Sequence, residues 1–227
     1  MNHKVVLRVM LSISIMLMVA LQFVSCKQHV TPSGETEAKE YLGVKLTPIS
    51  EQRNNAIKGT QHIDKDTYKL TVDGLVDDQL SLTYADLLSL PMESRLVTLN
   101  CVEGWSFTAK WTGPTLASIF DKAKLQPNAK TVIFHTADDS SGFTSLDLQY
   151  ILDNRIIIAL KLNDVTLAAD RGFPFQVVAE GKFGYKWAKW ITRIELSSSE
   201  DFRGYWEKEG YSNNADVNGP AFEQSGQ

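Results

Sequence analysis

One cysteine dominates the chemistry that this sequence could perform. Cys101 stands in the segment Asn100–Trp105 (NCVEGW), directly after a run that alternates like a strand, and the only other cysteine of the 227 residues is Cys26. If Cys26 is consumed by export processing, Cys101 has no partner in its own chain. Such a thiol can be a buried core residue, a nucleophile, half of an intermolecular disulfide, or a ligand for a soft metal.

The leader of the chain has the pattern of an export signal. Lys4 and Arg8 precede an almost wholly apolar run over residues 9–24. The ending Ser25–Cys26 resembles a bacterial lipoprotein processing site, at which Cys26 becomes lipidated. Ordinary cleavage and an uncleaved anchor are the alternatives, although the apolar run is short for a membrane span. We therefore expect an exported domain on the outer side of the bacterial cytoplasmic membrane or in the periplasm, held by lipid on Cys26.

Composition divides the chain into four parts. We assign residues 1–25 to the signal peptide, 26–48 to a polar, flexible tether, 49–215 to one folded domain and 216–227 to a C-terminal tail. A domain of this length can bury a substantial core. The net charge of −4 gives no basic footprint for nucleic acid.

Hydrophobic spacing predicts the elements that position Cys101. Strands are expected at residues 68–72, 95–101, 131–134, 156–160, 175–179 and 190–196, and helices at 83–88, 114–125 and 146–152. Thr83 and Asp86 have the spacing of a capping box. The aromatic, Gly-rich stretch from Asp201 onward is expected to wrap the surface. Strands mixed with short helices favour one α+β domain over a regular βαβ array.

Most cofactor motifs are missing from the sequence. It has no Walker loop, no dinucleotide-binding Gly fingerprint, no zinc-type Cys/His cluster and no Cys-x-x-Cys-His haem site. No sequence feature brings Cys101 to His135 as a nucleophilic pair. A buried, inert thiol is the simpler alternative, but a free thiol in an exported protein is open to oxidation. One cysteine cannot build a metal site alone, yet it can supply one thiolate to a cofactor that brings the other ligands.

Several segments together resemble one enzyme family. Residues 97–105 (VTLNCVEGW) resemble the cofactor-cysteine segment of the sulfite-oxidase superfamily of molybdopterin enzymes. The resemblance continues in order through Trp111–Leu116, Asn128–Thr136, Gly172–Pro174, Gly184–Lys186 and Lys189–Glu195. It is strongest to the branch that holds the catalytic subunit of the periplasmic methionine sulfoxide reductase. It implies an α+β fold of the sulfite-oxidase type, a molybdopterin-binding domain with mixed β-sheets and short helices.

The resemblance also implies roles for individual residues. Cys101 corresponds to the catalytic thiolate ligand of molybdenum, and Thr136 to a residue that bonds the pterin. Lys189, with the backbone of Trp187 and Ala188, corresponds to the holder of the cofactor phosphate. A solvated strand charge is the alternative role for Lys189, and an ordinary strand residue is the alternative for Thr136.

Other positions match or depart from the family pattern. Asn55 matches an N-terminal Asn that contacts the cofactor. The reductase branch usually has Asn and Arg where this chain has Arg171 and Gln176; we expect both to contact the cofactor, with Arg171 reaching the phosphate as a replacement cation. Phe143 occupies the position implied for a substrate-side Tyr of sulfite oxidases, and Glu103 stands where their arginine-rich pocket lies. Both departures make sulfite a poor substrate.

The sequence therefore predicts an oxidoreductase with a molybdenum–molybdopterin cofactor. It transfers an oxygen atom on a small-molecule substrate, with sulfoxide reduction favoured over sulfite oxidation. Without a haem motif, its electrons come from a separate haem or quinone-linked protein. Absence of the dimerisation domain of sulfite oxidases favours a monomer. The alternative is a membrane-tethered, cofactor-free binding module that keeps the fold; Arg171, Gln176 and a leader without an Arg-Arg pair favour it.

Overall fold

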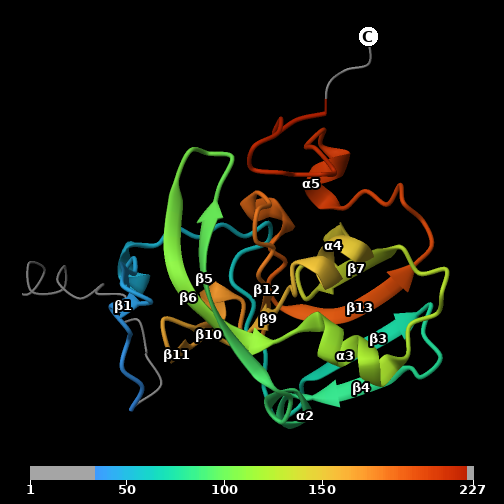
Figure 1. Cartoon of the computed structure of the whole chain (residues 1–227), viewed down its shortest axis with the longest axis horizontal. Coiled ribbons are helices and arrows are strands. Elements are labelled where there is room, and N and C mark those ends of the chain that lie inside the picture. Colours follow the sequence, from blue (N-terminus) through green and yellow to red (C-terminus); the bar gives the residue numbers. More distant parts are fainter. Residues whose placement is uncertain (1–33, 224–227) are drawn as a thin grey trace, which may run out of the picture. The chain divides into compact units, whose positions relative to one another are not determined.

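The computed structural model describes residues 34–223, so the leader and Cys26 lie outside the described residues. The fold is α+β, with mixed sheets and short helices, which confirms the predicted fold class (Figure 1). Its largest sheet has five strands: β3 (Lys69–Gly74), β4 (Leu80–Thr83), β7 (Thr131–Thr136), β8 (Thr144–Asp147) and β13 (Ile191–Ser197). Their order is β4–β3–β13–β7–β8, and β13 pairs parallel with β3 but antiparallel with β7.

A second sheet carries Cys101 at the end of its longest hairpin. It contains β5 (Met92–Asn100), β6 (Ser106–Pro114), β10 (Lys161–Leu162) and β11 (Val165–Thr166), in the order β11–β10–β6–β5. The hairpin of β5 and β6 pairs from Met92↔Pro114 to Asn100↔Ser106, so Cys101 begins its turn. Two smaller pairs complete the strands: β1 (Glu40–Tyr41) with β2 (Val44–Lys45), and β9 (Ile158–Ala159) with β12 (Gln176–Val177).

The helices are short and are set by local signals. They are α2 (Tyr84–Leu88), α3 (Leu116–Ala123), α4 (Leu148–Asp153) and α5 (Tyr205–Lys208), with 3₁₀ turns η1 (Ile49–Glu51), η2 (Ala169–Arg171) and η3 (Gly184–Lys186). The capping box before α2 is present, because Thr83 and Asp86 bond each other's backbone N–H groups. The helix predicted from Leu146 begins two residues later, since Leu146 still pairs in β8 and Asp147 caps α4.

The predicted flexible tether over residues 26–48 is wrong where the structure describes it. The Glu35 carboxylate accepts a hydrogen bond from Lys161 Nζ at 2.9 Å. The Glu37 carboxylate accepts one from the side-chain amide of Asn163 at 3.1 Å. The polar side chains that suggested a solvated tether instead accept hydrogen bonds from β10 and from the turn between β10 and β11. The folded unit therefore begins by Glu35.

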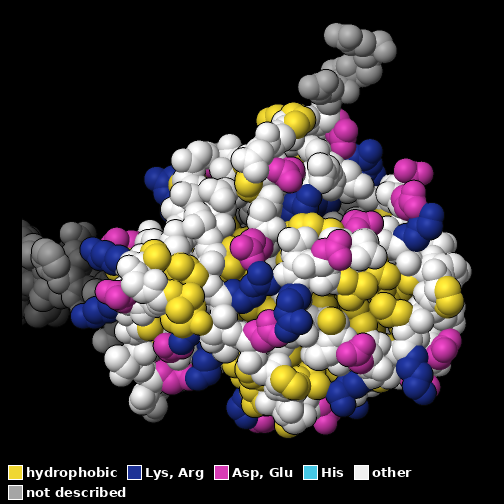
Figure 2. Space-filling view, viewed as in Figure 1, with side chains coloured by type: hydrophobic (Ala, Val, Ile, Leu, Met, Phe, Trp, Pro, Cys, Tyr) yellow, Lys and Arg dark blue, Asp and Glu magenta, His cyan; other side chains and the backbone are white. Residues whose placement is uncertain are grey.

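The predicted C-terminal tail from residue 216 is also part of the folded unit as far as the description extends. Asp216 forms a backbone bridge with Lys182, and Phe222 forms one with Tyr211. No helix among residues 34–223 is both long enough and apolar enough to cross a membrane. On the face shown in Figure 2, Lys and Arg side chains are interspersed with Asp and Glu, so that face has no broad basic patch.

Candidate active site

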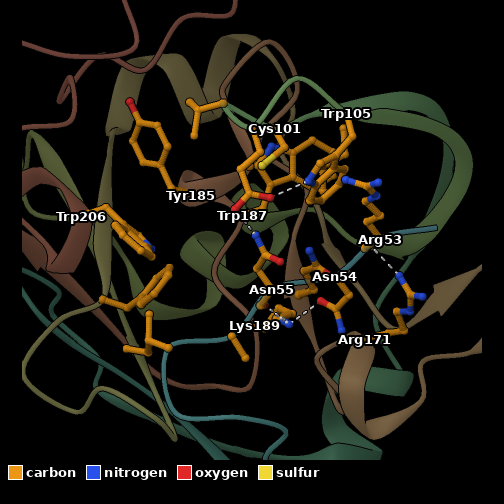
Figure 3. A pocket seen from close by; sticks show the side chains of 18 of the residues that line it. Arg53, Asn54, Asn55, Cys101, Trp105, Arg171, Tyr185, Trp187, Lys189 and Trp206 are labelled. Carbon is orange, nitrogen blue, oxygen red and sulfur yellow. Dashed lines mark hydrogen bonds between the residues drawn. The ribbon is translucent and has the colours of Figure 1, made fainter.

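A cavity of about 560 Å³ opens beside Cys101 (Figure 3). Segments that are far apart in the sequence form its walls. They are the N-terminal segment 53–57, the turn from Cys101 to Trp105, the η2–β12 region with Arg171 and Gln176, and the stretch 184–190. Further lining residues lie outside these segments: Leu99, Phe107, Trp111, Asp138, Phe143, Trp206 and Tyr211. The cavity therefore depends on the tertiary fold.

The turn after β5 presents the Cys101 thiol at the cavity. The Cys101 N–H donates to the carbonyl of Trp105 at 2.9 Å, and the Gly104 N–H donates to the carbonyl of Cys101 at 3.1 Å. Gly104 adopts a φ of 84°, which a glycine reaches without steric cost. Burial raises the pKa of the Cys101 thiol; the backbone N–H of Glu103 offsets part of this rise, and the Glu103 carboxylate adds to it. A bound metal cation would have to offset the net rise in pKa to hold the thiolate.

Lys189 supplies positive charge on another side of the cavity. Its Nζ donates to Asn54 Oδ1 and to the carbonyl of Asn55, each at 2.6 Å, and to the carbonyl of Asp170 at 3.2 Å. It also lies 4.3 Å from the ring centroid of Trp190. Burial lowers the pKa of Lys189 to about 8, and the charge of Arg171 lowers it as well. A partly buried ammonium whose partners are neutral oxygens is suited to an anionic ligand.

Arg171 bonds to the backbone of the N-terminal segment. Its guanidinium donates to the backbone carbonyls of Ile49, Gln52 and Arg53, at 3.1, 2.7 and 3.2 Å. The side chain borders the cavity, but its two terminal nitrogens are committed to the N-terminal segment. Contact between Arg171 and the cofactor phosphate therefore stays a prediction, and the bonds present in the structure go to the backbone of residues 49–53. Arg171 thereby fixes the segment that carries Asn54 and the other cavity residues.

Asn55 connects the N-terminal segment to the Cys101 turn. Its side-chain amide donates to Glu103 Oε1 at 3.1 Å, and Glu103 Oε2 accepts the indole N–H of Trp105 at 2.8 Å. Together with the Lys189 contact to its carbonyl, Asn55 links two sides of the cavity. The structure thus brings Asn55, Cys101 and Lys189 around one space, as the sequence-based hypothesis requires.

The remaining predicted residues are placed less directly. Thr136 is only 1% exposed and donates its hydroxyl to Asp138 at 2.7 Å, and Asp138 is the one that lines the cavity. Gln176 and Trp187 line the cavity. The N–H groups of Trp187 and Ala188 already donate to carbonyls of η3, both at 3.1 Å, so they are not free phosphate donors.

His135 lies apart from the cavity lining. Its Nδ1 is 2.9 Å from the carbonyl of Ser140, and its Nε2 is 2.9 Å from Glu195 Oε2. The structure therefore does not bring His135 to Cys101 as a nucleophilic pair.

Sequence reasoning missed part of the lining. Besides the predicted residues, the cavity is lined by Arg53, Asn54, Trp105, Tyr185, Trp206 and Tyr211. The two asparagines and Arg53 stand together as RNN, and that polar cluster was a usable signal. The aromatic residues after position 201 were expected to lie on the surface. No local sequence signal indicates that Trp206 and Tyr211 line the same cavity as Cys101.

The donor set fits a metal that brings most of its own ligands. Residues 34–223 contain no group of three or more His, Cys, Asp and Glu side chains that could hold a metal ion. Cys101 can supply one soft thiolate, which suits a high-valent molybdenum centre held otherwise by an organic dithiolene. Lys189, positioned by the side-chain oxygen of Asn54 and the backbone carbonyl of Asn55, can donate to a phosphate tail. The residues present therefore fit a molybdenum–molybdopterin group.

Comparison with known families agrees with this chemistry. Residues 57–206 match the family described as the oxidoreductase molybdopterin binding domain. The chain belongs to this family, whose cofactor is molybdenum–molybdopterin. This confirms the predicted superfamily and cofactor class.

Individual relatives come from the same superfamily. A putative protein-methionine-sulfoxide reductase subunit YedZ1 of Azospira oryzae is 34% identical over 151 residues, which are 66% of this chain and 56% of that protein. The protein-methionine-sulfoxide reductase catalytic subunit MsrP of Campylobacter jejuni is 27% identical over 190 residues, covering 77% of this chain and 63% of its own. The chain thus spans less than two thirds of either relative.

Two further similarities broaden the picture. The mitochondrial sulfite oxidase of Drosophila melanogaster is 31% identical over 175 residues, 66% of this chain and 30% of that protein. The crystal structure of the sulfane dehydrogenase SoxCD from Paracoccus pantotrophus superimposes with a TM-score of 0.61 at 24% identity, covering 64% of this chain and 42% of that chain. The structural match establishes the shared fold.

Proposed function

We propose that this protein reduces a small sulfoxide through a molybdenum–molybdopterin centre. The observation that carries the proposal is the pairing, across one cavity, of a single thiol at Cys101 with a partly buried ammonium at Lys189. In the net reaction the S=O bond breaks, two electrons and two protons are consumed, and a sulfide and water form. A separate haem or quinone-linked protein supplies the electrons, because the sequence carries no haem-attachment motif.

The chain's residues divide the work of holding and shaping this site. When bound, the cofactor supplies two-electron oxygen-atom transfer chemistry. Cys101 supplies a ligand to the metal. Lys189 would hold the anionic tail, Asn54 and Asn55 position its ammonium group, and Arg171 keeps the segment with the two asparagines in place. The Trp105 ring stacks on Phe107 with a centroid distance of 6.3 Å, and both rings line the cavity.

Charge beside Cys101 favours a sulfoxide over sulfite. The Glu103 carboxylate is close enough to raise the pKa of the thiol, so it would also repel a sulfite anion. A neutral sulfoxide is not repelled by this carboxylate. The names of relatives support the same direction, since two of them are named as protein-methionine-sulfoxide reductase subunits. Because another relative is named as a sulfite oxidase, sulfite is the substrate against which sulfoxides should be compared.

The decisive experiment measures metal and activity together. Protein purified from its native host after molybdenum-replete growth is expected to contain about one molybdenum per chain and to reduce dimethyl sulfoxide with a dye as electron donor. Cys101→Ser should lose most of the metal and the activity, because a hydroxyl is a poor ligand for a soft centre. Protein from molybdenum-depleted growth is the control for dye-driven background.

A different result would support the second candidate function. Protein without molybdenum under replete growth would identify a cofactor-free binding module that retains the fold. Turnover of sulfite, but not of sulfoxides, would reverse the proposed substrate preference.

The proposed setting is the outer side of the bacterial cytoplasmic membrane. It rests on the leader alone, in which Cys26 follows the apolar run over residues 9–24. Lipid on Cys26 would hold the domain close to a membrane-bound electron donor.

A further inference from the structure

The C-terminal segment builds one side of the cavity from aromatic rings. Trp206 and Tyr211 line the cavity together with Tyr185 of η3, and we call these three residues the aromatic wall. Tyr211 contacts both of the other rings edge-on, with centroid distances of 5.2 Å to Tyr185 and 5.4 Å to Trp206. Such contacts define the ring orientations, so the wall is a preformed surface.

A buried ion pair fixes the wall to the domain. Lys186 Nζ donates to Glu207 Oε1 at 2.5 Å, and both side chains are almost fully buried. Lys186 also donates to the carbonyl of Ser145 at 3.0 Å, and Thr144 Oγ1 donates to the same Glu207 oxygen at 2.5 Å. Because Lys186 follows Tyr185 and Glu207 follows Trp206, the pair holds both wall segments against β8.

The wall lies on the Cys101 side of the cavity. Asn100, the residue before the thiol, forms a backbone bridge with Phe183, so η3 begins directly beside the end of β5. Figure 3 shows Tyr185 and Trp206 on one side of Cys101, with Lys189 and Arg171 in a different direction. A substrate must approach the metal that Cys101 holds, whereas Lys189 serves the anionic tail. The wall therefore faces the space left for substrate.

The wall presents ring faces. The hydroxyl of Tyr185 donates to the carbonyl of Ser212 at 2.8 Å. Burial raises the pKa of Tyr185, so this hydroxyl stays protonated and engaged. With this hydroxyl engaged, the ring of Tyr185 remains as apolar surface, and aromatic rings bind flat apolar groups through offset or edge contacts.

We propose that the aromatic wall determines substrate specificity by favouring sulfoxides with an aryl or similarly flat apolar substituent over those with small alkyl groups only. This inference rests on the proposed sulfoxide reduction. In this inference Tyr185, Trp206 and Tyr211 contact the substituent of the substrate. The sulfoxide oxygen points toward the metal.

The test compares two substrates in the molybdenum-loaded holoenzyme. We expect kcat/KM for methyl phenyl sulfoxide to exceed that for dimethyl sulfoxide, and Tyr211→Ala or Trp206→Ala to lower the ratio of the two by roughly tenfold. Tyr211→Phe is the matched control, because it keeps the ring and should keep the ratio. The difference in intrinsic reducibility of the two sulfoxides cancels when the ratio is compared between variants.

A binding measurement separates this inference from the reaction itself. Methyl phenyl sulfone and dimethyl sulfone carry the same substituents as the two sulfoxides but are not substrates. Their affinities for the protein can be measured by calorimetry. Tighter binding of the aryl sulfone, lost in Tyr211→Ala and retained in Tyr211→Phe, supports the wall even if neither sulfoxide is reduced, an outcome that would overturn only the proposed reaction. Equal binding of both sulfones, or a substrate ratio that both alanine variants leave unchanged, overturns the inference. Molybdenum content and thermal unfolding of each variant identify misfolded protein, and the milder Trp206→Leu and Tyr211→Leu then replace the alanine variants.

Discussion

Lys189 is a partly buried cation whose direct partners are all neutral. Its three hydrogen bonds go to one amide oxygen and two backbone carbonyls. Burial opposes the charged form, and the positive charge of Arg171 opposes it further, which is why the pKa falls to about 8. In the absence of an anion the protein therefore carries an electrostatic cost at neutral pH.

This cost predicts a pH-dependent stability of the cofactor-free protein. The folded-state pKa of Lys189 lies near 8 and the ordinary value is 10.5, so between these values the unfolded chain binds more protons. The free energy of unfolding of wild type, relative to Lys189→Met, should rise by up to about 3 kcal/mol as the pH increases from 8 to 10.5. Urea unfolding of both proteins across this range measures the difference. The exposed Lys122→Met substitution controls for the loss of a lysine as such. If the free energy of unfolding of wild type, relative to Lys189→Met, fell as the pH increased, the lowered pKa of Lys189 would be contradicted.

Arg171 acts on a whole segment, and its loss should be visible there. Arg171→Met removes the donor to three carbonyls of residues 49–53 and leaves those acceptors without their partner. We expect faster amide hydrogen exchange over residues 49–57 and weaker retention of molybdenum, since Asn54 and Asn55 lose their support. Exchange within α3 serves as the internal reference. Unchanged exchange at 49–57 with lost molybdenum would instead mean that Arg171 contacts the cofactor directly.

The ion pair between Lys186 and Glu207 anchors α5 to β8. Replacing one partner leaves a charge buried, so Lys186→Met and Glu207→Leu should each lower the free energy of unfolding by about 3–5 kcal/mol. The double variant should be more stable than the sum of the single effects predicts, because it buries no unpaired charge. Denaturant unfolding in a double-mutant cycle measures the coupling, and additive effects would show that the pair is not coupled.

Local signals predicted elements well, while distant contacts decided the rest. The capping box of Thr83 and Asp86 and the apolar face of α3 act within a few residues, so α2 and α3 could be predicted. The N-terminal stretch was predicted as a tether because its polarity has no local partner. Its partner, Asn163, stands 126 residues away from Glu37.

The candidate site follows the same division. Cys101 could be predicted because a lone cysteine has few other uses in a chain whose leader has the pattern of an export signal, within a family-like segment. The aromatic wall could not, because Tyr185 and Tyr211 come from separate segments that meet only in the tertiary fold, where the buried pair of Lys186 and Glu207 holds them together. Arg171 was assigned to the phosphate by position, and only the structure reveals the backbone carbonyls that engage it.

At the scale of the whole molecule, Cys26 predicts where the protein resides. Cys26→Ala in the full-length chain should abolish incorporation of radiolabelled palmitate and move a large part of the mature protein from the membrane to the soluble fraction, because one acyl-bearing residue is the proposed attachment. The matched Ser25→Ala keeps a small residue before the cysteine and should keep the lipid. Palmitate labelling that persists in Cys26→Ala would contradict the anchor.

The walls of the cavity come from both ends of the described chain. This determines whether the cofactor can be inserted before or only after folding. Arg53 and Asn54 are held by Arg171 and Lys189, contacts that span 118 and 135 residues of sequence. The aromatic wall closes still later along the chain, at Trp206 and Tyr211. Contacts over such separations form late, after loop closure has brought the segments together. A chain still emerging from the ribosome, or threaded in extended form through a membrane, therefore has no place to receive the cofactor. Insertion must follow completion of the fold, on whichever side of the membrane that occurs.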